Sequence, residues 1–135
     1  MAFGSLVKLY FSSAAVFFVL DMIWLGVVAK GFYRQHLGSL LRPDVNWPGA
    51  ILFYLIFIAG IEYFATVPSV AKGSAVQAAL AGALFGFVTY ATYDLTNYAT
   101  MKDFPLVVVI VDMAWGTVLS CAVTVAGYFF ATRVP

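Results

Sequence analysis

The chain has 135 residues, of which 64% are hydrophobic and only 10% are charged. Ordinary soluble domains have roughly 45–50% apolar and about 25% charged residues. Seven Lys and Arg against six Asp and Glu leave a net charge of +1, without the basic excess that a nucleic-acid partner would need. The single cysteine, Cys121, excludes an internal disulfide, and no Cys/His set has the spacing of metal ligands. The composition therefore predicts an integral membrane protein that binds neither nucleic acid nor a structural metal.

The first predicted element is an apolar helix over about residues 6–29, which Asp21 interrupts. The longest polar stretch follows, at residues 30–47. Within it, apolar side chains recur at helical spacing opposite Lys30 and Arg34. This pattern indicates a short amphipathic helix that lies in the membrane interface.

Three further apolar segments complete the chain. Pro48 suits the first turn of a second helix, and Pro68 is expected to end that helix. Ser74 and Gln77 have the spacing of a capping box at the start of the third. The predicted spans cover about residues 6–29, 48–67, 75–99 and 104–131.

Connections of about 5–8 residues between the last three spans require antiparallel neighbours. The expected fold class is therefore an all-α integral membrane protein with a single domain. We expect an antiparallel four-helix transmembrane bundle with a short amphipathic interfacial segment between the first and second spans. The charges that flank the two membrane faces nearly balance, so the sequence leaves the orientation open, dual topology included.

Four acidic residues fall inside the predicted spans: Asp21, Glu62, Asp94 and Asp112. A carboxylate in hydrocarbon costs at least about 2.5–3.5 kcal/mol, so the default expectation for such a side chain is that it faces the bundle interior and is functional. At about 1.5 Å of rise per residue, the three aspartates share one half of the membrane. Glu62 is expected near the opposite face, where it reaches water by snorkelling. The cations available to neutralise the aspartates are Lys30, Arg34 and Lys102.

Aromatic and polar side chains accompany the aspartates. A tryptophan follows Asp21 and Asp112 by three residues, which places each pair on one helix face. In the third span, Tyr90, Asp94 and Asn97 form a stripe that has Tyr93 beside it. The sequence therefore predicts a ligand- or proton-binding pocket near one membrane face, made of Asp21, Trp24, Tyr90, Tyr93, Asp94, Asn97, Asp112 and Trp115.

Four segments resemble, in their order and spacing, a family of small four-span bacterial membrane proteins of unknown function. They are LDMIWLG at 20–26, GFYRQHLG at 31–38, TYDLTNYAT at 92–100 and VDMAWGT at 111–117. The resemblance covers essentially the whole chain. It implies a multi-pass protein of the cell's inner membrane, and it assigns no reaction, substrate or cofactor.

The leading functional hypothesis is the binding or transport of a small cation, a proton or a lipid-like ligand, because carboxylates beside aromatic rings suit cations. A first alternative is a lipid-modifying membrane enzyme, or an accessory to one, which would use the carboxylates for acid–base chemistry. This alternative is the weaker because the sequence offers no nucleophile–base pair. A second is a structural subunit of a larger membrane complex. For the aspartates themselves, the competing interpretation is a hydrogen-bonded network that only locks the bundle.

The expected partners are membrane lipids, a second copy of the chain and the larger complex already named. Gly82 and Gly86 form a small-xxx-small pair, which permits close helix packing within the bundle or between two copies. The sequence identifies no cofactor, and it does not distinguish a bound pigment, quinone or lipid.

Overall fold

The computed structural model describes residues 1–134, and in this part of the chain it contains helices and no strand. The elements in chain order are α1 (Phe3–Ile23), η1 (Trp24–Val28), α2 (Phe32–Leu37), η2 (Gly38–Leu40), α3 (Trp47–Ile61), η3 (Glu62–Thr66), α4 (Val67–Lys72), α5 (Ala75–Thr100) and α6 (Leu106–Arg133). Consecutive elements join into four helices that are long and apolar enough to cross a membrane, counted over the described residues. The protein is therefore an all-α membrane bundle, as predicted.

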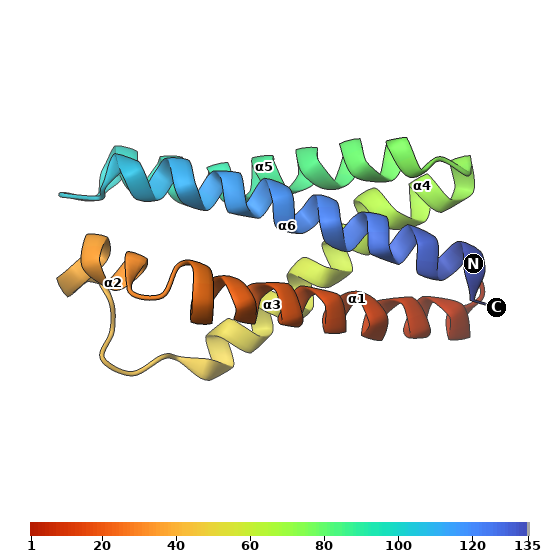
Figure 1. Cartoon of the computed structure of the whole chain (residues 1–135), viewed down its shortest axis with the longest axis horizontal. Helices are drawn as coiled ribbons and strands as arrows, with labels where there is room; N and C mark the ends of the chain where they lie inside the picture. The colour runs from red at the N-terminus through yellow and green to blue at the C-terminus, as the bar shows by residue number, and fades with distance from the viewer. Residues whose placement is uncertain (135) are drawn as a thin grey trace.

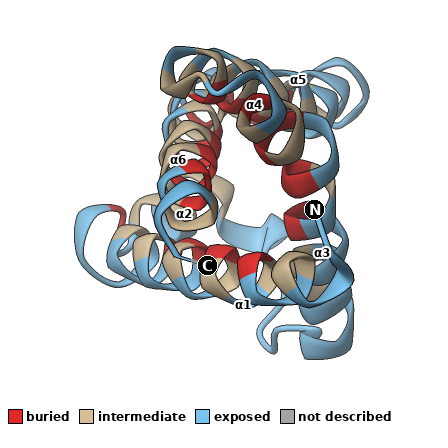
Figure 2. Ribbon diagram, turned by 90° about the vertical axis from the view of Figure 1, so that its right-hand side faces the viewer, coloured by how far each residue is buried: buried red, intermediate tan, exposed pale blue. Residues whose placement is uncertain are grey.

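The helices α5 and α6 lie side by side along most of their length, and α1 runs antiparallel to α6 (Figure 1). The helix that begins with α3 crosses the others obliquely, and both chain termini lie at the end of the bundle away from α2. Viewed along the bundle, the buried parts of the four long helices lie on the side that faces the centre, and the exposed parts lie on the outside (Figure 2). Most outward side chains are apolar, which suits a surface in contact with lipid.

Local side-chain signals set the starts of two helices. The Ser74 hydroxyl accepts a hydrogen bond from the Gln77 backbone N–H at 3.0 Å, as the capping-box spacing predicts. At the start of α3 the Asn46 side chain accepts from the Gly49 N–H, and Pro48 lies in the first turn.

The second span does not end at Pro68. It continues to Lys72, beyond the predicted end at 67. A proline in a helix removes one hydrogen bond, and its ring clashes with the carbonyl four residues earlier. The wider π-helical turn η3 ends at Thr66, two residues before Pro68, and it includes Phe64, the residue four positions before the proline. The π-helical turn accommodates the ring, so the helix continues to Lys72 instead of stopping.

Gly82 and Gly86 are buried against α6 of the same chain. A Cβ atom at Gly82 would lie 2.7 Å from the Ser120 carbonyl oxygen, and one at Gly86 would lie 2.6 Å from the Ser120 hydroxyl. The two glycines therefore allow close approach of α5 and α6 within one bundle. This intrachain contact occupies the face that we had considered for a second copy. A homodimer stays a prediction, and it would need another face.

An apolar cluster fills the middle of the bundle and separates two polar layers. It consists of Phe17, Phe57, Ile58, Ile61, Leu119 and Val123. Along α1, Ser13 lies on one side of Phe17 and Asp21 on the other, and all three side chains are buried. The aspartates therefore lie in one half of the bundle, and a second polar layer that includes Glu62 lies in the other.

Glu62 does not snorkel to the membrane surface, contrary to the prediction. Its side chain is only 8% exposed and points into the bundle toward Ser13 of α1. Its Oε1 atom has no hydrogen-bond partner within residues 1–134. The predicted depth of Glu62, in the half of the bundle opposite the aspartates, is correct. The side chain faces the interior because of the way its helix is rotated about its axis.

Candidate functional site

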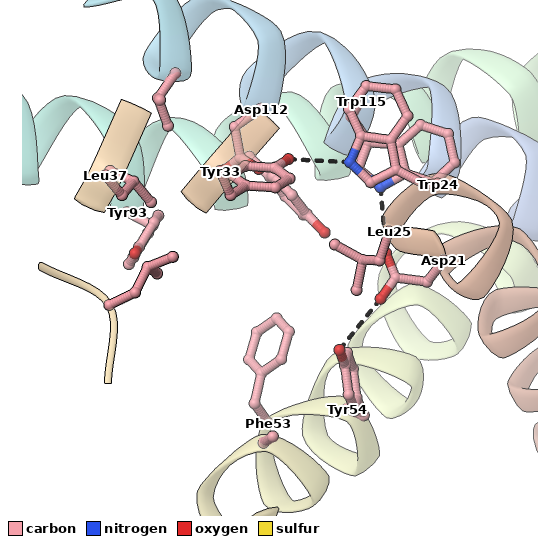
Figure 3. A pocket seen from close by; sticks show the side chains of 14 residues that line it. Asp21, Trp24, Leu25, Tyr33, Leu37, Phe53, Tyr54, Tyr93, Asp112 and Trp115 are labelled. Atoms are coloured by element: carbon pink, nitrogen blue, oxygen red, sulfur yellow. Dashed lines mark hydrogen bonds between the residues drawn. The ribbon is translucent and has the colours of Figure 1, made fainter. Parts of the chain in front are cut away.

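A cavity of about 390 Å³ opens in the half of the bundle that contains the aspartates. Residues of α1, η1, α2, α3, α5 and α6 contribute to its wall (Figure 3). Seven of its fourteen lining residues are aromatic: Trp24, Tyr33, Phe53, Tyr54, Tyr90, Tyr93 and Trp115. Six of the eight predicted site residues line it, namely Asp21, Trp24, Tyr90, Tyr93, Asp112 and Trp115.

Asp21 is held by donors from two other helices. The Tyr54 hydroxyl of α3 donates to Oδ2 at 3.1 Å, and the Trp115 indole N–H of α6 donates to Oδ1 at 3.3 Å. Asp21 is 7% exposed, so most of its polar surface depends on these two bonds. Each carboxylate oxygen thus accepts a hydrogen bond from a neutral donor, and neither donor carries a positive charge.

Asp112 is held by a chain of two hydrogen bonds that reaches η1 through α2. The Tyr33 hydroxyl donates to Asp112 Oδ1 at 2.8 Å, and the Trp24 indole N–H donates to the Tyr33 oxygen at 3.0 Å. Burial raises the pKa of the Tyr33 phenol, and the negative charge of Asp112 raises it further. Tyr33 therefore stays a neutral donor, and its bonds tie α2 to the bundle.

The two Asp-Met-x-Trp segments pair with each other across α1 and α6. The Trp24 and Trp115 rings are stacked, with centroids 4.5 Å apart and planes within 5°. Trp115 donates directly to Asp21, whereas Trp24 reaches Asp112 through Tyr33. Each tryptophan is thus hydrogen-bonded, directly or through Tyr33, to the aspartate of the opposite helix. The sequence interpretation paired each aspartate with the tryptophan of its own helix and so missed these contacts between helices.

Asp94 and Asn97 are the two predicted residues that do not line the cavity. Asp94 is fully buried next to the carboxyl group of Asp112, and neither of its side-chain oxygens has a hydrogen-bond partner among the described residues. Asn97 is half-buried outside the cavity wall. On α5, Tyr90 and Tyr93 line the cavity, whereas Asp94 is buried beside Asp112 and does not line it.

Tyr33 and Tyr54 are the site residues that sequence reasoning missed. Tyr33 was assigned to an interfacial segment and not to the pocket. Tyr54 lies seven residues after Trp47, the first residue of α3, and seven residues correspond to about 11 Å of helix. That depth matches the depth expected for Asp21, so comparing the depths of all polar side chains would have indicated Tyr54.

The loop cations do not reach the cavity. Lys30, Arg34 and Lys102 are exposed, and the fourteen lining residues include Asp21 and Asp112 but no Lys, Arg or His. Residues 1–134 also contain no group of three or more His, Cys, Asp or Glu side chains that could hold a metal ion. The cavity wall thus presents two carboxyl groups and aromatic rings without a basic side chain.

Four apolar helices around a polar, aromatic cavity define a multi-pass membrane protein with a cavity inside the bundle. A family model described as "Predicted membrane protein (DUF2177)" matches residues 6–129. The chain belongs to this family of membrane proteins, to which no function is assigned. No curated protein and no solved structure matches the chain.

Proposed function

We propose that this protein binds an organic cation, small or lipid-like, in the cavity between α1, α3, α5 and α6. The observation that supports the proposal is the composition of the wall: two carboxyl groups, seven aromatic rings and no basic side chain. An ammonium group is attracted by carboxylates and also by the faces of aromatic rings. An anion would find no basic side chain in the wall, and the two carboxylates would repel it.

The arrangement of the carboxyl groups favours such binding energetically. Asp21 and Asp112 are oriented by hydrogen bonds from Tyr54, Trp115 and Tyr33 before any ligand arrives. A cation therefore spends little binding free energy on ordering them. A unit charge about 4 Å from one carboxylate gains about 4 kcal/mol at an effective dielectric constant near 20, so removing one charge should weaken binding considerably.

We extend the proposal to transport across the membrane. The central apolar cluster, which includes Phe17 and Leu119, lies between the cavity and the polar layer around Glu62. A ligand in the cavity could reach the other half of the bundle only after this cluster rearranges. Such an arrangement favours a carrier with alternating access over an open pore. The resemblance to small bacterial membrane proteins supports the inner membrane of a cell as its location.

The test uses the fluorescence of a Trp47→Phe background, in which Trp24 and Trp115 remain as reporters within the cavity. The probes are choline and its neutral isostere 3,3-dimethylbutan-1-ol. We expect a saturable change with choline only. The apparent affinity should fall at least about tenfold in Asp21→Asn, which corresponds to about 1.4 kcal/mol.

Asp44→Asn is the matched control, because Asp44 is an exposed loop acid outside the cavity. It should bind choline as the background protein does. Equal responses to both probes, or an Asp21→Asn variant that binds normally, would refute the proposal. The carboxyl groups would then be structural acceptors, and partner proteins should be sought. Uptake of labelled choline into proteoliposomes tests the transport step, and binding without uptake would restrict the protein to a receptor role.

A further inference from the structure

A second cavity, of about 310 Å³, adjoins the first between α3 and α5. We call it the fissure, and its lining residues are Phe53, Phe57, Thr89, Tyr90, Tyr93 and Asp112. Four of these, Phe53, Tyr90, Tyr93 and Asp112, also line the first cavity. The two spaces are therefore adjacent, and these four residues belong to the walls of both.

The fissure results from the oblique course of the second span. The helix α5 packs on η3 and α4 at one end of the bundle, whereas α3 makes little contact with it (Figure 1). The two helices therefore diverge toward the end that contains the aspartates. Phe53 and Tyr93 line this opening and are 48% and 57% exposed. Both residues lie within helices that are long and apolar enough to span a membrane, so we place this opening against lipid.

The chemistry of the fissure changes along its length. Asp112 lies where it joins the first cavity, and the remaining wall is mostly aromatic ring surface. The Thr89 hydroxyl donates to the Phe85 carbonyl of its own helix at 2.8 Å, so its one proton is not available to a ligand. The fissure is therefore a path from a site with two carboxyl groups to the apolar interior of the bilayer.

We infer that the ligand is a cationic amphiphile dissolved in the bilayer, with an amine or ammonium head group and a hydrocarbon chain. This inference rests on the proposed function and adds the class of ligand. The head group lies between Asp21 and Asp112, and the chain leaves through the fissure between α3 and α5. The ligand enters sideways from the membrane and keeps its chain in an apolar environment throughout.

The position of α2 supports lateral entry. Leu37 of α2 and Leu41 after η2 line the first cavity, and Tyr33 ties α2 to Asp112. Toward the membrane surface at this end, apolar and hydrogen-bonded groups therefore line the cavity, while the fissure adjoins it on the side of α3 and α5. A hydrocarbon chain needs no hydrogen-bond partner in the fissure, whereas the polar groups of a hydrophilic ligand would need one.

The experiment fills the fissure and compares a long probe with a short one. Thr89→Phe, in the Trp47→Phe background, places a ring where the chain would lie. The probes are dodecyltrimethylammonium and choline, each titrated at one fixed lipid concentration so that partitioning into lipid is the same for all variants. We expect Thr89→Phe to weaken dodecyltrimethylammonium binding at least about tenfold through steric overlap and to leave choline binding unchanged.

Val88→Phe is the matched control, because Val88 is adjacent, 52% exposed and outside the fissure wall. It should affect neither probe. Thr89→Leu adds less volume and should give a smaller loss for the long probe, which keeps the test valid if Thr89→Phe fails to fold.

The two proposals fail in different ways. If Thr89→Phe and Thr89→Leu bind dodecyltrimethylammonium normally while Asp21→Asn weakens both probes, the chain does not occupy the fissure and the inference is wrong. The proposed cation site would then stand. If neither probe binds, or if Asp21→Asn binds both normally, the proposed function itself is overturned.

Discussion

Replacing Tyr33 by phenylalanine removes one hydroxyl group that connects three elements of the bundle. Tyr33 belongs to α2, accepts a bond from Trp24 of η1 at 3.0 Å and donates one to Asp112 of α6 at 2.8 Å. The ring of phenylalanine occupies the same volume, so packing is preserved. Tyr33→Phe therefore isolates the contribution of the two hydrogen bonds.

The expected loss can be estimated from these two bonds. A side-chain hydrogen bond in a membrane bundle contributes about 0.6 kcal/mol on average and at most about 1.7 kcal/mol. A partly buried polar group that loses its partner costs about 1–3 kcal/mol when water does not replace that partner. Trp24 and Asp112 are both half-buried, so some replacement by water is expected. We therefore expect Tyr33→Phe to lower the free energy of unfolding by about 1–2 kcal/mol.

The assay is reversible unfolding in mixed micelles, with Tyr63→Phe as the control. Tyr63 is 74% exposed, and its hydroxyl should contribute little. In the Trp47→Phe background, Tyr33→Phe should also change the emission of Trp24, whose indole N–H loses its acceptor. Equal unfolding free energies for Tyr33→Phe and Tyr63→Phe would show that the chain from Trp24 to Asp112 does not stabilise the bundle.

Three further predictions concern packing, a buried acid and alkaline pH. Gly86→Ala should destabilise the bundle by about 1–3 kcal/mol in thermal unfolding, because its methyl group would overlap the Gly116 carbonyl; Gly4→Ala, with nothing within 4 Å, should be neutral or slightly stabilising. Glu62→Gln should not lower the free energy of unfolding, because Oε1 has no hydrogen-bond partner within residues 1–134. A decrease above about 2 kcal/mol would contradict this and would mean that the carboxylate has a partner. Burial raises the pKa of Tyr33, so above about pH 10 the unfolded chain loses this proton before the folded one. Stability should therefore fall as pH rises through this range, and less steeply in Tyr33→Phe; equal slopes would contradict this.

The class of protein and the helices could be predicted from the sequence because they depend on composition and on local contacts. An excess of apolar residues requires a membrane, and segments of about 20 such residues form spans. Ser74 and Gln77 meet across one turn, so their spacing alone predicted the start of α5. The depth of Asp21, Asp112 and Glu62 along their helices also follows from counting residues.

The site depended on how each helix is rotated about its axis, and the sequence contains little information on that rotation. In water, an amphipathic pattern shows which face of a helix is buried. In a membrane, lipid and protein interior are equally apolar, so the outward and inward faces are nearly alike in composition. For this reason the sequence did not show that Tyr93 lines the cavity while Asp94 does not. It also did not show that Glu62 faces the bundle interior instead of snorkelling.

Contacts between distant segments were decided by tertiary structure alone. Trp24 and Trp115 stack on each other across two antiparallel helices, and Tyr54 of the second span bonds to Asp21 of the first. These contacts, like the bond from Trp115 to Asp21, depend on where whole helices cross. The fissure between α3 and α5 depends on the same oblique crossing, because α5 packs on η3 and α4 but makes little contact with α3. Composition and spacing thus determined a four-helix membrane protein with buried acids. Packing between the helices decided which acids share a cavity and where that cavity opens, because these properties arise from contacts that no single helix contains.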